Sequence, residues 1–173
     1  MSKKFDKNKI TLTDIRSEYK IGYKYIPEED AYKGNYEKYQ PSQEVIDKIK
    51  SWLDEKEEHL VIVAFGATWC GDCKEQLPHL VKIERTLKNK RFEVRVLTGI
   101  KVKAPYEREK GKLIWKSPPS PPETLDERFD MVHIPAIFIF NKLGQCIGKI
   151  DEKPEHKATL EEEILYYLEN AEL

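Results

Sequence analysis

Cysteine and long apolar segments are scarce in this chain of 173 residues, which has three cysteines. Three cysteines are too few for the disulfide frameworks that stabilise small secreted domains. The apolar run Leu60–Phe65 is far shorter than the roughly 20 residues that a membrane-spanning helix requires. Residues 1–6 include basic side chains but no apolar core follows them, so we expect no secretory signal. We therefore expect a cytoplasmic protein without a membrane partner.

The chain also lacks an excess of charge of one sign: 30 basic and 31 acidic residues give a formal net charge of −1. A protein without a net charge is not drawn to nucleic acid or anionic lipid by its overall field. Residues 99–124 combine scattered lysines with Tyr106 and Trp115, but Glu107 and Glu109 offset these charges. We therefore expect no nucleic-acid partner.

Apolar periodicity predicts alternating strands and helices. The continuous apolar run Leu60–Phe65, rich in β-branched residues, predicts a strand buried on both faces. Further strands are predicted over Phe92–Leu97, Ala136–Phe140 and 145–150. Helices are predicted over Gln43–Lys56, 71–89, 125–132 and from Leu160 onward. Two apolar strands joined by a helix form a βαβ unit, so we expect the strands Leu60–Phe65 and Phe92–Leu97 to be parallel.

Residues 1–41 are rich in tyrosine and precede the periodic part of the chain. They hold six of the nine tyrosines: Tyr19, Tyr23, Tyr25, Tyr32, Tyr36 and Tyr39. We expect an extension whose rings pack on the core, the alternative being an arm that binds a partner. Alternating apolar and polar residues over 21–25 predict a short edge strand. Ser42 can cap the helix that follows and marks the boundary of the main domain, residues 42–173.

Two cysteines lie where the strand Leu60–Phe65 leads into the next helix. Cys70 and Cys73 are three positions apart, so the second sulfur lies one helical turn from the first, close enough for a disulfide. The N-terminus of a helix collects unpaired N–H groups and the positive end of the helix dipole, which stabilise a thiolate. In a cytoplasmic protein such a pair is catalytic or binds a metal.

The residues around this pair resemble the active site of the thioredoxin superfamily. Trp69-Cys70-Gly71-Asp72-Cys73 follows an apolar strand, Pro78 lies five residues after the second cysteine, and Ile134-Pro135 precedes a later strand. The family has a counterpart of each feature. The resemblance implies an α/β thioredoxin-like fold in residues 42–173, with a central mixed sheet flanked by helices.

The resemblance also implies a thiol–disulfide oxidoreductase that reduces protein disulfides and needs no cofactor. In that case Cys70 is the nucleophile, and Cys73 resolves the mixed disulfide. Trp69 is expected to pack beside the dithiol and shield it. Ile134 and a cis Pro135 are expected to face the dithiol and to pair with a substrate strand. The implied partners are proteins that contain disulfides and a reductase or thiol that donates electrons.

Three positions depart from the family pattern. Asp72 replaces a proline, and its carboxylate suits a helix N-terminus but disfavours a nearby thiolate. Ala64 occupies the position of a buried aspartate that assists proton transfer in the family. We therefore expect either that Asp72 or water carries the proton here, or that turnover is slower at the resolving step. Glu152 stands in place of a glycine that lines the family's substrate groove.

Residues 99–124 form an insertion relative to the family, ahead of the segment that contains Pro135. Their Ser-Pro-Pro-Ser-Pro-Pro stretch cannot belong to one long regular element. The insertion follows the strand Phe92–Leu97, and parallel strands end at the same edge of a sheet. Our hypothesis is that the insertion flanks Cys70 and contributes to substrate choice, the alternative being a passive loop.

Two other functions are compatible with the sequence. One is a redox-inactive or weakly active module that uses the fold to bind a partner. The other is a metal protein, in which Cys146 and His79 or His133 would join the cysteine pair. These three residues lie on other predicted elements without ligand spacing, so we expect no metal site. We expect His133 to be a solvated loop residue and Cys146 to be buried as a small apolar residue.

Overall fold

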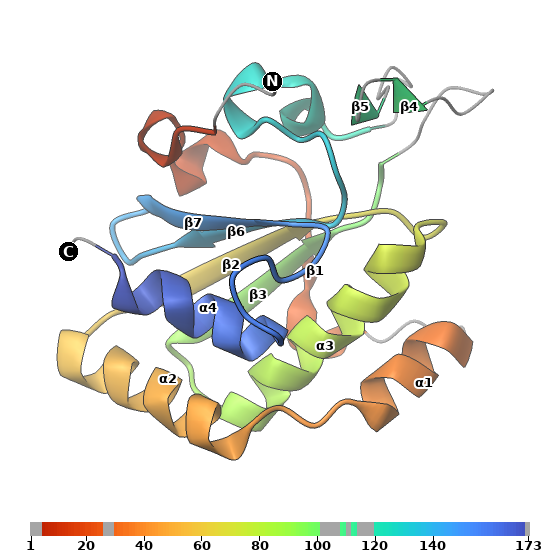
Figure 1. Ribbon diagram of the computed structural model, residues 1–173. Coiled ribbons are helices and arrows are strands. Elements are labelled where there is room, and N and C mark those ends of the chain that lie inside the picture. Colours follow the sequence, from red (N-terminus) through yellow and green to blue (C-terminus); the bar gives the residue numbers. More distant parts are fainter. Residues whose placement is uncertain (1–4, 26–29, 101–107, 110–111, 114–119, 172–173) are drawn as a thin grey trace.

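The computed structural model describes residues 5–25, 30–100, 108–109, 112–113 and 120–171. Its centre is a mixed five-stranded sheet with the strand order β1-β3-β2-β6-β7. The helices α1 to α4 lie on one side of this sheet, and short N-terminal turns and the segment that precedes β6 lie on the other (Figure 1). The predicted α/β architecture with a central mixed sheet is confirmed.

The strands pair as the βαβ pattern predicts. β2 (Leu60–Phe65) is parallel to β3 (Phe92–Leu97) along its whole length. On its other side β2 is antiparallel to β6 (Ala136–Phe140), which is antiparallel to β7 (Cys146–Asp151). Every residue of β2 is buried, because β2 has a strand on each side and chain segments on both faces. This fully apolar strand leads into the segment that carries the cysteines.

Three helices follow the predicted positions. α2 (Gln43–Lys56) begins after Ser42, whose hydroxyl accepts a hydrogen bond from the N–H of Val45 at 3.4 Å. α3 (Gly71–Leu87) ends two residues earlier than predicted. α4 (Leu160–Glu169) is the last helix of the described residues. Their apolar side chains, spaced at helical intervals, face the sheet and one another: Ile46, Ile49, Trp52, Leu53, Leu77, Leu80, Ile164 and Leu168 are all buried.

The N-terminal part contains a helix that the pattern of apolar residues does not predict. α1 (Asp30–Lys38) has only one buried residue, Tyr32, and packs against α3. The expected edge strand is present as β1 (Lys20–Ile21), antiparallel to β3. It is shorter than predicted because Gly22–Lys24 turns into a 3-10 helix. A Cβ at Gly22 would lie 2.5 Å from the Cβ of Val94, so this close approach to β3 requires glycine.

The helix predicted over 125–132 is wrong. Two short 3-10 helices, η4 (Pro122–Leu125) and η5 (Glu127–Phe129), occupy this region instead. The side chain of Asp126 caps η5, and Asp130 ends it in the left-handed conformation (φ 48°), so no continuous helix forms. The buried Phe129 holds η5 against Phe65 and Phe138 of the sheet.

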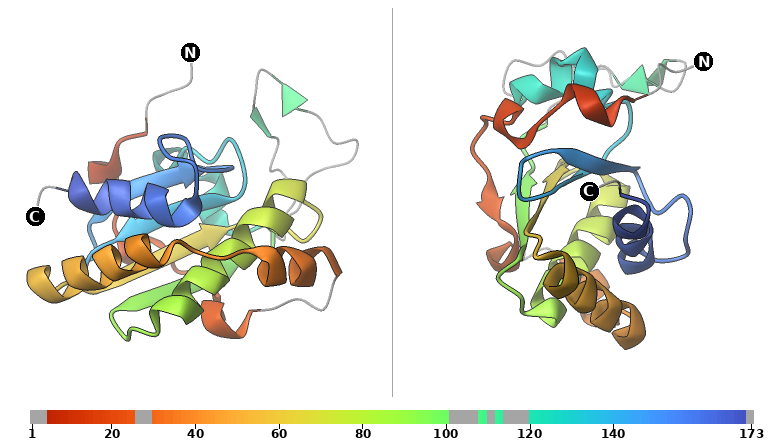
Figure 2. Two further views of the ribbon diagram at one scale, coloured as in Figure 1. Left: turned by 60° about the horizontal axis from the view of Figure 1, so that its bottom comes forward. Right: turned by 90° about the vertical axis from the view of Figure 1, so that its left-hand side faces the viewer.

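Further short elements lie on the same side of the sheet as η4 and η5. The 3-10 turns η1 (Lys7–Lys9) and η2 (Leu12–Asp14) belong to the N-terminal segment, and β4 (Arg108–Glu109) pairs with β5 (Lys112–Leu113) in the insertion (Figure 2). The rest of 101–119 lies outside the described residues. None of the helices in the described ranges has the length and apolar character needed to cross a membrane.

Candidate active site

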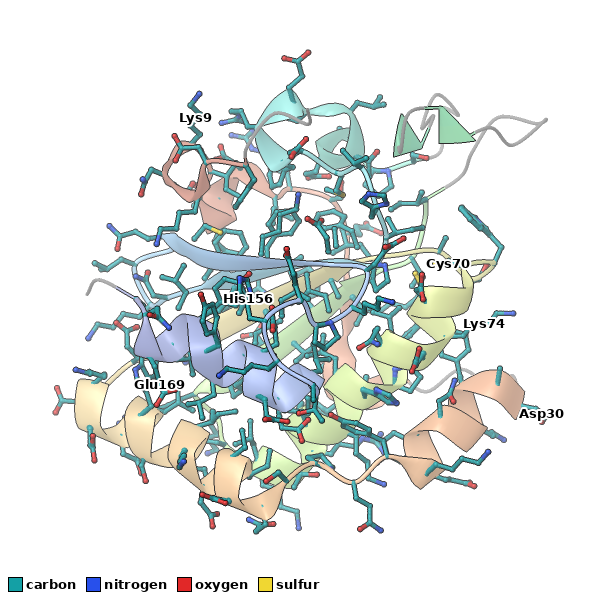
Figure 3. The ribbon with its side chains drawn as sticks, in the orientation of Figure 1. Lys9, Asp30, Cys70, Lys74, His156 and Glu169 are labelled. Carbon is teal, nitrogen blue, oxygen red and sulfur yellow. The ribbon has the colours of Figure 1, made fainter. Side chains whose placement is uncertain are left out.

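The cysteine pair lies at the N-terminal end of α3, beyond the end of β2 (Figure 3). After Phe65 the chain continues through Gly66, whose N–H donates to the carbonyl of Leu97 at 2.8 Å, so β2 and β3 stay joined at this edge. A Cβ at Gly66 would lie 3.0 Å from the Sγ of Cys73, so a larger residue here would press on the sulfur. Cys70 is the N-cap residue, in the extended conformation that precedes the helix.

The two sulfurs differ in their surroundings. The Sγ of Cys70 accepts a hydrogen bond from the backbone N–H of Cys73 at 3.3 Å, the geometry of a side-chain N-cap. Cys70 is 8% exposed, whereas Cys73, one turn further into the helix, is completely buried. Both cysteines are free thiols. The first cysteine is therefore the one that solvent or a substrate can reach.

These surroundings separate the acidities of the two thiols. A hydrogen bond from the thiol of Cys73 lowers the pKa of Cys70 from 9.0 to about 7, and backbone N–H groups of Cys73 and Asp72 act in the same direction. Burial and the charge of Asp72 oppose this decrease. The same hydrogen bond, together with burial and the charge of Cys70, raises the pKa of Cys73 far above its ordinary range. The pair therefore consists of one acidic thiol and one that holds its proton.

Ile134 and Pro135 lie against this pair. The carbonyl oxygen of Ile134 is 3.6 Å from the Sγ of Cys70, close enough to accept a hydrogen bond from the thiol. The peptide bond between Ile134 and Pro135 is cis. The position follows from the sheet register, because Ala136, the first residue of β6, is opposite Phe65, the last residue of β2. The residue before β6 therefore meets the segment that follows β2.

Trp69 lies directly before Cys70, at the edge of the site. The residue is 41% exposed, and its Nε1–H donates to the carbonyl of Ile100 at 3.2 Å. Trp69 thus connects the cysteine segment to the start of the insertion. A Cβ at Gly99 would lie 3.9 Å from Pro121, so the other end of the insertion lies here too. Both ends of the insertion are therefore at the edge of the sheet that carries Cys70.

Asp72 and Ala64 occupy two of the three positions at which the sequence analysis found a departure from the family pattern. Asp72 is half-buried in the first turn of α3, where its charge raises the pKa of both cysteines. Ala64 is completely buried in β2 and has no ionisable group to offer. Asp72 is therefore the carboxylate adjacent to the dithiol along the chain.

The sequence did not identify that His133 and Glu152 lie together beside Ile134. The Nδ1 of His133 lies 3.5 Å from a carboxylate oxygen of Glu152, and each side chain is about one-third exposed. The N–H of Glu152 also donates to the carbonyl of Pro135 at 2.9 Å. Nineteen positions separate the two residues along the chain, and only the pairing of β6 with β7 brings them together. No local spacing could have revealed this pair.

Cys146 and His79, which the sequence offered as metal ligands, make other contacts in the structure. Cys146 is buried in β7, where burial raises its pKa to about 11 and its thiol donates to the carbonyl of Gly148 at 3.4 Å. His79 stacks on the ring of Tyr39 with the ring centroids 3.8 Å apart. Across the described residues, no group of three or more His, Cys, Asp or Glu side chains has an arrangement that could hold a metal ion.

Comparison with known proteins gives one family match and several structural matches. Residues 17–99 match a family model described as thioredoxin. An HIV epitope-scaffold is 15% identical, with a TM-score of 0.43 over 81% of this chain and 76% of that one. A protein of unknown function from Pseudomonas aeruginosa is 15% identical, with a TM-score of 0.43 over 75% and 68% of the two chains. Mitochondrial thioredoxin 3 from Saccharomyces cerevisiae, in its oxidized form, is 23% identical, with a TM-score of 0.34 over 59% and 76%.

No curated protein matches the chain. The family match supports the thioredoxin superfamily, and the mixed five-stranded sheet with its helices is consistent with a thioredoxin-like fold. The sequence had implied this fold from the residues around Cys70 and Pro135.

Proposed function

We propose that the protein is a thiol–disulfide oxidoreductase that reduces protein disulfides through Cys70 and Cys73. The observation that carries the proposal is the contrast between the two thiols. Cys70 has a pKa of about 7 and a sulfur at a helix N-terminus, whereas Cys73 is buried and keeps its proton. This is the division of roles that two-step disulfide exchange requires.

In the first step the thiolate of Cys70 attacks one sulfur of the substrate disulfide. A new S–S bond forms between Cys70 and that sulfur, and the second substrate sulfur leaves as a thiolate that takes up a proton. The N–H of Cys73, 3.3 Å from the attacking sulfur, stabilises the thiolate before attack. The carbonyl of Ile134, 3.6 Å from the same sulfur, lies where a substrate backbone would approach.

In the second step Cys73 loses its proton and attacks the sulfur of Cys70. The Cys70–Cys73 disulfide forms, and the first substrate sulfur leaves as a thiol, so two electrons have passed to the substrate. Because Ala64 cannot take the proton of Cys73, we assign that role to Asp72 or to water. A reductase or a small thiol then returns two electrons to the disulfide. A reducing compartment such as the cytoplasm supplies such donors.

A trapping experiment tests this proposal. The Cys73→Ser variant, incubated with an oxidised protein such as insulin, is expected to accumulate a mixed disulfide through Cys70, seen by mass spectrometry and cleaved by dithiothreitol. Cys146→Ser is the matched control, because it removes a buried cysteine away from the pair and should leave turnover intact. If Cys73→Ser forms no adduct, or if the Cys70→Ser variant reduces insulin as fast as the wild type, the proposal is wrong.

A redox-inactive binding module remains the second candidate, and the observation that favours it is the buried apolar Ala64. Because Ala64 offers no carboxylate to take its proton, a thiol as buried as Cys73 would resolve the mixed disulfide slowly. A module would hold its partner equally well when both cysteines are replaced by serine. An enzyme of the proposed type would lose its disulfide-dependent complex in that variant.

A further inference from the structure

The tyrosines of the N-terminal extension divide into two groups. Four pack on the rest of the chain, and these are buried or partly buried: Tyr25, Tyr32, Tyr36 and Tyr39. The other two, Tyr19 and Tyr23, are exposed together with Ile21 between them, each to between 43% and 47%. Six large apolar residues of the described part of the chain are exposed, and these three lie within five consecutive positions. Exposed apolar side chains that gather in this way indicate an interaction surface.

These residues lie at an open edge of the sheet. β1 is the first strand in the sheet order, and among the described residues it pairs with β3 alone (Figure 2). At the opposite edge, by contrast, η1 packs against β7. An edge strand has N–H and C=O groups that point away from the sheet and can pair with a further strand. The edge of β1 is therefore a place where a strand can be added.

The two faces of this edge carry different side chains. The guanidinium of Arg95, which is opposite Ile21 in the register of β1 and β3, lies 4.5 Å from the ring centroid of Tyr19. Tyr19 and Ile21 therefore share a face, and Glu18 and Lys20 point to the other. Glu18 and Lys20 are both exposed. A lone lysine on an edge strand opposes pairing with a second copy, but here an opposite charge lies two positions away.

The charges make this edge complementary to itself. In an antiparallel pair every second residue directs its N–H and C=O toward the partner, so a two-fold axis between identical strands passes through one residue. An axis at Lys20 would place two lysines opposite each other, which is unfavourable. An axis at Tyr19 places Glu18 opposite Lys20 of the second copy, twice by symmetry, and brings the two Tyr19 rings together. The charges therefore favour the register centred on Tyr19.

We propose that residues 18–21 form a homodimer interface, in which two copies of this chain pair antiparallel about Tyr19. The two five-stranded sheets then form one continuous sheet across the two-fold axis. Because the ladder is short, the dimer is weak, with a dissociation constant in the micromolar range. The inference goes beyond the proposed redox function and does not depend on it.

Sedimentation velocity of the reduced full-length protein between about 5 and 500 µM tests the interface, and the wild type should change from monomer to dimer in this range. Glu18→Lys and Lys20→Glu each place like charges opposite each other at two symmetric positions, so each should raise the dissociation constant about 5- to 30-fold. The double variant Glu18→Lys/Lys20→Glu exchanges the two charges and should return the constant to within about 3-fold of the wild type. Lys24→Glu is the matched control, because it makes the same charge change at an exposed position beyond the strand.

Cross-linking tests the register. In a Cys70→Ser/Cys73→Ser background, Tyr19→Cys places two thiols opposite each other at the axis, so oxidation with copper phenanthroline in air should form an intermolecular disulfide. Tyr23→Cys replaces a tyrosine of similar exposure away from the axis, and it should cross-link at least about 5-fold more slowly.

Each outcome decides the proposal. A wild type that stays monomeric up to about 500 µM overturns it and leaves a different macromolecule as the occupant of the edge. A dimer that neither single charge change weakens, a double variant as weak as the single ones, or equal cross-linking at both positions overturns it as well. A dimer that the single changes weaken, that the double variant restores and that Tyr19→Cys captures supports it. None of these outcomes affects the reductase function, which trapping with Cys73→Ser tests separately.

Discussion

The side-chain amide of Asn35 donates a hydrogen bond to the backbone carbonyl of Lys74 at 2.9 Å. In a regular helix the N–H of the residue four positions later would occupy that carbonyl, but in α3 this residue is Pro78, which has no N–H. Asn35 of α1 therefore satisfies the carbonyl that the proline leaves unpaired. α1, which the sequence pattern did not predict, thus supports the first turns of α3, the helix that carries the cysteines.

This relationship predicts that Asn35→Ala destabilises the protein by about 1 kcal/mol, because a partly buried carbonyl loses its donor. Urea denaturation measures the change. The Pro78→Ala variant supplies an N–H in place of the amide, so Asn35→Ala should cost much less in that background. Equal costs in both backgrounds would show that Asn35 acts in another way.

The low pKa of Cys70 predicts an alkylation profile that is easily measured. With iodoacetamide, the rate of modification of Cys70 should rise with a midpoint near pH 7, the pKa of this thiol. Cys73 should remain unmodified in the folded protein, because its pKa is raised and it is completely buried. Cys70→Ser provides the blank for this reaction. A midpoint near 9, the ordinary value for a cysteine, would contradict the proposed activation.

The charge of Asp72 predicts a second effect on Cys70. Because this carboxylate raises the pKa of Cys70, Asp72→Asn should lower it and increase the alkylation rate at pH 6 by about 2- to 3-fold. If Asp72 also carries the proton of Cys73, the same variant should slow turnover with a protein disulfide. The Asp72→Pro variant should then change the pH–rate profile as well. An unchanged profile in both variants would leave water as the proton carrier.

The position of the insertion predicts a separation between small and large substrates. Because both ends of the insertion lie next to each other at the edge near Trp69, a short glycine–serine linker can replace residues 103–119. We expect this variant to reduce a small aromatic disulfide at the wild-type rate and a protein disulfide several-fold more slowly. Equal losses with both substrates would mean that the insertion supports the fold and does not select substrates.

Glu84 predicts a dependence of stability on pH. Burial raises the pKa of this carboxyl from 4.5 to about 7, although it accepts a hydrogen bond from the N–H of Val94 at 2.9 Å. Between pH 4.5 and about pH 7, this carboxyl is ionised in the unfolded chain and protonated in the folded chain, so folding takes up a proton. The contribution of Glu84 to the free energy of unfolding is therefore most favourable below about pH 4.5, and this advantage is lost as the pH rises through about 7.

We therefore expect the free energy of unfolding of Glu84→Gln, relative to that of the wild type, to increase by about 1 to 3 kcal/mol between pH 5 and pH 8. Urea denaturation at both pH values measures this difference. Glu55→Gln, at an exposed position of α2, is the control for loss of one charge. A stability difference that is the same at both pH values would show that Glu84 does not titrate in this range.

Much of the architecture was predictable because it depends on local patterns. The apolar run Leu60–Phe65 could only be stable as a buried strand, and the spacing of apolar residues over Gln43–Lys56 suited only a helix. The helix α1 could not be predicted, because it buries only Tyr32 and depends on contacts with α3. The helix predicted over 125–132 failed for a related reason. Phe129 packs into the core from a 3-10 turn, and apolar spacing alone does not distinguish the two helix types.

The sequence by itself determined that Cys70 and Cys73 share one helix turn after a buried strand, since this requires only neighbouring residues. The tertiary structure decided what surrounds the two sulfurs. The carbonyl of Ile134 reaches Cys70 from 64 positions away, and His133 meets Glu152, because β6 pairs with β2 on one side and with β7 on the other. A thiol pKa depends on charges and donors within a few ångströms, and strand register rather than distance along the chain determines which groups those are.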